Sequence, residues 1–141
     1  MDTTDLTTQE EQFVAGYREA ILWAGSDWHG MVDDNPDPLD DNYGDDDWTD
    51  EAKAEMAAEC LDFIRGNRAD LVLAHTLRTD AAGDPYEGWA WLGHDFALTR
   101  NGHGAGFWDR GIGDVGRRLT DACRPYGETN EWADGEHLHA S

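Results

Sequence analysis

An asparagine–glycine pair inside an unusual run of residues constrains the fold more than any other feature of this chain. The run, His94 to Arg110, reads HDFALTRNGHGAGFWDR, and Asn101-Gly102 lies at its centre. This dipeptide favours the positive φ angles of a two-residue type I′ turn, whose twist matches that of two antiparallel strands. Period-2 alternation then places Phe96 opposite Phe107. The sequence therefore predicts a β-hairpin whose apolar face meets the core.

Two helices are predicted before this hairpin. Thr8-Gln9-Glu10-Glu11 has the form of a capping box, and apolar residues follow at helical spacing until Gly25 ends the run. Thr49 can cap a second helix from about Asp50 to about Leu77. Gly66-Asn67 is a weak point in it, because glycine inside a helix costs about 1 kcal/mol. Two shorter helices are the alternative.

Residues 26–49, between these helices, are rich in glycine, proline and aspartate, and no regular element fits them. A loop this long is uncommon in a compact domain and is usually functional or disordered. Aromatic and apolar residues recur in it, among them Leu39, Tyr43 and Trp48. We therefore expect a loop that is anchored to the core at intervals.

A short third helix is predicted after the hairpin, capped by Asp114 and ended by Pro125 and Gly127. Beyond it, residues 128–132 and 136–139 flank a turn and favour a second, weaker hairpin that adds strands to the first sheet.

These elements predict a single acidic α+β domain, residues 1–141. Two amino-terminal helices pack on a small antiparallel sheet built around the central hairpin, and the short carboxy-terminal helix closes one edge. The predicted core consists of large apolar side chains from all of these elements: Phe13, Tyr17, Ile21, Met56, Cys60, Phe63, Phe96, Leu98, Phe107 and Leu119.

Charge sets the class of partner. The chain has 31 Asp plus Glu against 10 Lys plus Arg, a formal net charge of -21. Such a charge repels nucleic acid and anionic membranes, so direct binding to either is not expected. No apolar run approaches the roughly 18 residues that span a bilayer, and the first residues lack the basic region of a signal peptide. Cys60 and Cys123 fall on apolar helix positions, which suits buried thiols in a reducing cytosol.

Three stretches resemble a known group. LDDNY at residues 39–43, FVAGYREAILW at residues 13–23 and GHDFALTRNGHGAGFWDRG at residues 93–111 are similar to segments of small uncharacterised proteins encoded by tailed bacteriophages. The resemblance implies a phage origin and a location in the cytoplasm of the infected bacterial host. It implies no activity, so no catalytic residue is carried over.

A metal site is the first chemistry to weigh. Imidazoles and carboxylates of His94, Asp95, His103 and Asp109 would suit a divalent transition ion. In the predicted hairpin, however, the two histidines lie at opposite ends, roughly 20 Å apart at the rise of a strand. They could not share one ion, and we expect no metal.

Other small-molecule sites fit the sequence poorly. Asp40, Asn42 and Glu51 match positions 1, 3 and 12 of an EF-hand loop, but Asp45 stands where the loop needs glycine. The glycine-rich residues 102–106 lack the lysine and the helix of a phosphate-binding loop. Neither cysteine has the exposed, basic surroundings of a nucleophile. We expect no catalytic residue and no cofactor.

The acidic residues themselves carry the functional hypothesis. The stretch from Asp27 to Glu55 contains one lysine, Lys53, and no arginine. Carboxylates could replace the phosphates of duplex DNA, so the chain could be a non-enzymatic phage accessory protein that mimics DNA and blocks a host DNA-binding protein of defence or replication. The predicted partner-binding residues are Asp33, Asp34, Asp37, Asp40, Asp41, Asp45, Asp46, Asp47, Asp50, Glu51, Glu55 and Glu59.

Several alternatives stay open. The acidity can serve solubility, or it can be an adaptation to high salt, in which case the protein would unfold at low ionic strength. A structural or assembly protein would instead bury its tryptophans in a partner or a homodimer. A small enzyme would need titratable groups near a pocket at the hairpin.

Overall fold

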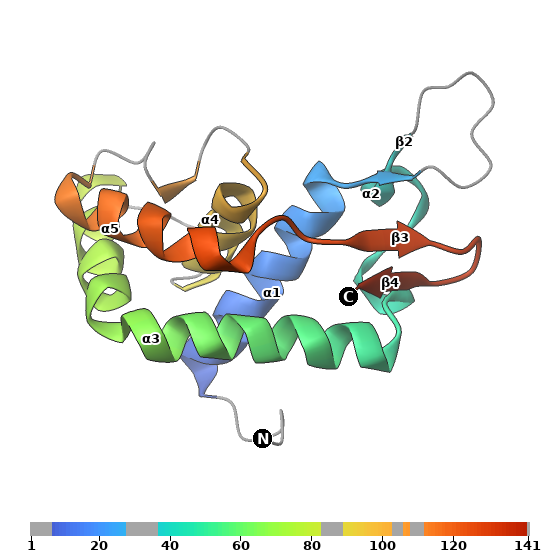
Figure 1. Cartoon of the computed structure of the whole chain (residues 1–141), viewed down its shortest axis with the longest axis horizontal. Helices are drawn as coiled ribbons and strands as arrows, with labels where there is room; N and C mark the ends of the chain where they lie inside the picture. Colours follow the sequence, from blue (N-terminus) through green and yellow to red (C-terminus); the bar gives the residue numbers. More distant parts are fainter. Residues whose placement is uncertain (1–6, 28–36, 83–88, 103–105, 108–111, 141) are drawn as a thin grey trace.

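The protein is mostly helical (Figure 1). The computed structural model describes residues 7–27, 37–82, 89–102, 106–107 and 112–140. Four long helices dominate this part of the chain, and two small antiparallel sheets complete it. The elements are α1 (Thr8–Ala24), β1 (Ser26–Asp27), β2 (Asp37–Pro38), α2 (Leu39–Asn42), η2 (Asp45–Asp47), α3 (Asp50–Ala82), α4 (Ala90–Arg100), α5 (Asp114–Cys123), η4 (Arg124–Tyr126), β3 (Glu131–Ala133) and β4 (Leu138–Ala140).

The predicted helices before residue 83 are confirmed in place. A capping box starts α1, one residue earlier than predicted: the Thr7 hydroxyl accepts from the Glu10 amide, and the Glu10 carboxylate accepts from the Thr7 amide. Helix α3 is kinked at Asn67, whose φ of -133° is not helical. The Asn67 side chain donates to the carbonyl oxygen of Phe63 across this break. The predicted weak point is therefore a real bend.

The prediction of a central β-hairpin is wrong. Residues 90–100 form the helix α4, and Asn101-Gly102 ends that helix instead of joining two strands. Gly102 has a φ of 72°, the left-handed conformation that commonly follows a helix, and its amide donates to the carbonyl oxygen of Thr99. The turn of a hairpin and the end of a helix both need a residue with positive φ after a regular element. The Asn-Gly dipeptide alone therefore does not distinguish them. Residues 103–105 and 108–111 of the predicted hairpin lie outside the described residues.

Close packing of α1 on α4 explains why residues 90–100 are helical. The two helices meet at two glycines, Gly16 and Gly93. A β-carbon on Gly93 would overlap the carbonyl oxygen of Phe13 and lie 2.9 Å from the backbone nitrogen of Tyr17. A β-carbon on Gly16 would overlap the carbonyl oxygen of Ala90 in the same way. This contact depends on residues far apart in the sequence.

The predicted core is confirmed although the hairpin is not. All ten predicted core side chains are buried. Phe96 on α4 stacks on Phe63 of α3 with ring centroids 4.2 Å apart, and it also contacts the rings of Phe13 and Tyr17. Leu92 and Phe96 are four residues apart, so a helix buries them on one face as readily as a strand buries alternate residues.

The predicted α+β class is wrong for the same reason. No sheet in the described residues carries a layer of helices, because β1–β2 and β3–β4 are separate two-stranded pairs. The carboxy-terminal hairpin is confirmed as β3–β4, with Trp132 paired to His139, but it joins no larger sheet. The short third helix is confirmed as α5, but its N-cap is Gly113, and Asp114, the predicted cap, is its first residue.

Two further features follow from burial. Cys60 and Cys123 are free and buried, and burial raises the pKa of both thiols, that of Cys123 to about 12. Among the residues that the structure describes, none of the helices has the length and apolar character that crossing a bilayer requires.

Candidate functional site

The predicted partner-binding acids fall on short elements and on the start of one long helix. Asp33 and Asp34 lie outside the described residues. Asp37 is in β2, Asp40 and Asp41 are in α2, and residues 45–47 form η2. The remaining four are on α3, where Asp50, Glu51 and Glu55 are exposed and Glu59 is partly buried.

The loop that carries these acids is anchored to the core. Leu39 is fully buried, Tyr43 packs against the core, and Trp48 is buried. Trp48 also bridges to Leu138 of β4, and the Thr49 amide donates to the carbonyl oxygen of Leu138 over 3.0 Å. The β3–β4 hairpin therefore lies against the start of α3, as Figure 1 shows on its right side.

This arrangement gathers acids from two distant parts of the sequence. We call α2, η2, residues 50–55 and β3–β4 with their connecting turn the acidic end of the molecule. Lys53 is the one lysine or arginine in these elements. The carboxylates with described side chains are Asp40, Asp45, Asp46, Asp47, Asp50, Glu51, Glu55, Glu131, Asp134 and Glu136.

Some of the predicted partner-binding acids form hydrogen bonds within the chain. The guanidinium of Arg18 donates two hydrogen bonds to Asp45. Asp47 accepts a hydrogen bond from the Gly44 amide and so caps η2. Glu59 accepts a 2.7 Å bond from Arg100, which lies in the interior. These three carboxylates are therefore engaged within the chain, whereas Asp46 and the exposed acids of α3 face solvent.

The hairpin adds an exposed tryptophan to the acidic end. Trp132 is 44% exposed, and its ring stacks on His139 with centroids 5.3 Å apart. The His139 ring bonds to the Asp134 carboxylate over 2.7 Å. Hydrogen bonds from His139 and from the amides of His137 and Glu136 hold the pKa of Asp134 well below its usual range. Asp134 is therefore ionised, and it fixes the turn beneath Trp132.

The opposite end of the molecule has a different charge balance. It consists of α3 beyond the kink together with α5 and the η4 turn that follows it; α3 beyond the kink and the start of α5 lie on the left of Figure 1. Arg118 binds Asp70 there, and this hydrogen bond lowers the pKa of the carboxyl. The arginines with described side chains are Arg68, Arg117, Arg118 and Arg124, and the acids are Asp70, Asp114 and Asp121. Positive and negative charges nearly cancel at this arginine end.

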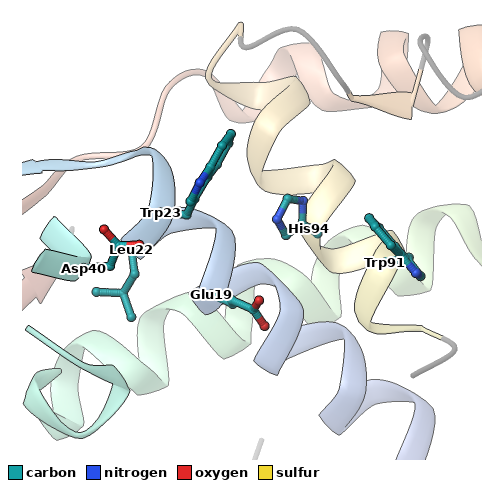
Figure 2. Close-up of a pocket in the computed structure, with 6 residues that line it drawn as sticks. All are labelled: Glu19, Leu22, Trp23, Asp40, Trp91 and His94. Carbon is teal, nitrogen blue, oxygen red and sulfur yellow. The ribbon is translucent and has the colours of Figure 1, made fainter. Parts of the chain in front are cut away.

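A pocket lies beside the acidic end, between α1 and α4 (Figure 2). Its volume is about 430 Å³. Two of its residues were singled out in the sequence for other roles, His94 as a possible metal ligand and Asp40 as a partner-binding residue. The pocket itself was not predicted, because its residues come together only through the α1–α4 packing. The lining residues are Glu19, Leu22, Trp23, Asp40, Trp91 and His94.

The calcium and metal sites were considered from the sequence and not expected, and only part of their residues can be located in the structure. Asp40 and Asn42 are in a helical turn, not in a calcium-binding loop. Within the described ranges, no group of three or more His, Cys, Asp or Glu side chains could hold a metal ion. His103 and Asp109 of the candidate metal cluster lie outside those ranges.

Comparisons of the chain with protein-family models, with curated proteins and with solved structures find no match. Any function therefore has to follow from the geometry of this chain itself.

Proposed function

We propose that this protein is a non-enzymatic accessory protein of a bacteriophage whose acidic end occupies the DNA-binding surface of a host defence or replication protein. The observation that carries the proposal is the concentration of carboxylates at one end of the molecule. Acidity that served only solubility or salt adaptation would have no need to avoid the arginine end. Binding to a partner with a basic surface would account for this uneven distribution of carboxylates.

The number of exposed carboxylates at the start of α3 supports mimicry of a nucleic acid. Asp50, Glu51 and Glu55 lie within one and a half turns of α3, or about 8 Å of helix axis at the usual rise per residue. All three side chains are exposed, and Lys53 in the same stretch offsets part of their charge. Duplex DNA likewise presents a high density of negative charge. Asp46 of η2 adds a further exposed carboxylate.

Trp132 adds an apolar contact that carboxylates alone would not provide. Tryptophan is enriched among the residues that dominate binding energy at protein interfaces, and charged residues commonly form the rim around them. Its exposed ring, with Asp134 and Glu136 in the adjoining turn, has this arrangement. A partner that covered the acidic end would bury the ring.

Capture from a host lysate tests the proposal. We expect the immobilised protein to retain a DNA-binding protein that added duplex DNA releases. The variant D46N/E51Q/E55Q removes three exposed charges from the acidic end and spares Asp45 and Asp47, which hold local structure. If each charge contributes about 0.5 kcal/mol, binding falls about tenfold.

The matched control removes three charges elsewhere. The variant E11Q/D114N/D121N changes the net charge equally but leaves the acidic end intact, so it should capture the partner as the native chain does. Equal weakening by both variants would indicate a general charge effect. Capture that survives duplex DNA, or no captured DNA-binding protein, would contradict the proposal and favour a structural role.

A further inference from the structure

The pocket between α1 and α4 has aromatic walls. The His94 ring lies between two indoles: its centroid is 6.2 Å from that of Trp23 and 6.0 Å from that of Trp91. Figure 2 shows the three rings in a row, with the Glu19 side chain below them and Asp40 beside Leu22. Trp23 is 59% exposed, so the pocket is open to solvent. Its volume of about 430 Å³ is in the range of ligand-binding sites.

The chemistry of this lining selects a cation. The faces of indole rings carry negative charge density and attract an organic cation within about 6 Å of the ring centre. Glu19 and Asp40 add two carboxylates at the same opening. An anionic ligand would be repelled by both carboxylates and by the net charge of -21.

We propose that this pocket binds a guanidinium group, and that the group belongs to an arginine side chain of the protein partner. A guanidinium is planar, so it can stack on an indole while its N–H groups donate to a carboxylate. Asp40 belongs both to the pocket and to the acidic end, so a partner lying on that end reaches the pocket opening. The assignment to a partner arginine rests on the proposed function, whereas guanidinium binding does not.

Titration of the isolated protein tests guanidinium binding without a partner. The probe is N-acetyl-arginine methylamide, a blocked arginine without other charges, at constant ionic strength. The readout is the indole N–H region of a ¹⁵N NMR spectrum, in which the signals of Trp23 and Trp132 are identified by their loss in W23A and W132A. We expect a saturable shift of the Trp23 signal in the millimolar range and none at Trp132.

Two variants and two further probes complete the test. W23A and E19Q alter exposed side chains and should keep the fold, and each should weaken binding by about threefold to tenfold. In W23A, which lacks the Trp23 signal, binding is followed at the signal of Trp91, the other indole of the pocket. W132A removes an exposed tryptophan outside the pocket and should leave binding unchanged. Tetramethylammonium should bind more weakly because it has no N–H groups. Free arginine should bind no more tightly, because its α-ammonium and α-carboxylate together add no net charge.

Each other result overturns a stated part of the proposal. No saturable shift, or equal shifts at Trp23 and Trp132, contradicts a binding pocket. Tetramethylammonium that binds as well as the blocked arginine contradicts the choice of guanidinium. Free arginine that binds more tightly contradicts a partner's side chain and indicates a free guanidino compound. Probe binding without capture from lysate contradicts the proposed function alone, and capture without probe binding contradicts this pocket alone.

Discussion

Replacing Gly93 by alanine should lower the melting temperature by at least about 10 °C. The new methyl group would overlap the carbonyl oxygen of Phe13, which belongs to the backbone of α1 and cannot rotate away as a side chain can. Overpacking usually costs about 1–3 kcal/mol, and we expect at least about 3 because whole helices must separate. The gain in helix propensity, about 1 kcal/mol, offsets only part of this cost.

Gly66 provides the matched control. It lies inside α3, but a β-carbon there would meet no atom within 4 Å. The variant G66A should therefore be as stable as the native protein, or more stable by up to about 1 kcal/mol. Thermal unfolding followed by circular dichroism measures both variants. If G93A melts at the native temperature, α1 and α4 do not cross at these glycines.

Replacing Arg100 by methionine should have the second large effect on stability. Its side chain, 3% exposed, donates to the Tyr17 hydroxyl, to the Glu59 carboxylate and to the carbonyl oxygens of Tyr126 and Gly127. These bonds join α1, α3 and α4 to the segment after α5. Methionine fills similar space but leaves the acceptors without a donor, so we expect a loss of about 3 kcal/mol.

Arg118 is the control for this second prediction. It also binds a carboxylate, that of Asp70, but half of its side chain is exposed. Exposed ion pairs contribute at most about 1 kcal/mol, so R118M should lower the free energy of unfolding by less than that. Urea unfolding of both variants gives the comparison. Equal losses would show that the Arg100 hydrogen bonds do not join the helices.

The positions of α1, α3 and α5 and the core residues could be predicted because they depend on local signals. The capping box, the apolar spacing of α1 and the Gly66-Asn67 break are all visible in the sequence. The segment from Phe96 to Phe107 was wrongly predicted as a β-hairpin because its apolar positions fit the period of 2 of a strand as well as one face of a helix. The packing of Gly93 against Phe13 favours the helix over the strand. No local sequence pattern indicates a contact between residues 80 positions apart.

The candidate site was predictable only in part. The acidic stretch is evident from composition, but its association with β3–β4 depends on the Trp48–Leu138 bridge. The bond from Arg100 to Glu59 was missed because Glu59 was predicted to bind a partner and Arg100 was placed in the predicted hairpin. Trp132 and the pocket around Trp23 depend on tertiary contacts in the same way.

The proposed function requires that the acidic end be the surface that meets the partner. Hydrogen–deuterium exchange of the captured complex, compared with the free protein, measures this most directly. Binding should slow the exchange of backbone amides in residues 44–55 and 131–140, while the amides of α5 and of α3 beyond residue 67 should exchange as in the free protein. Protection confined to α5 and that part of α3 would contradict the proposed function.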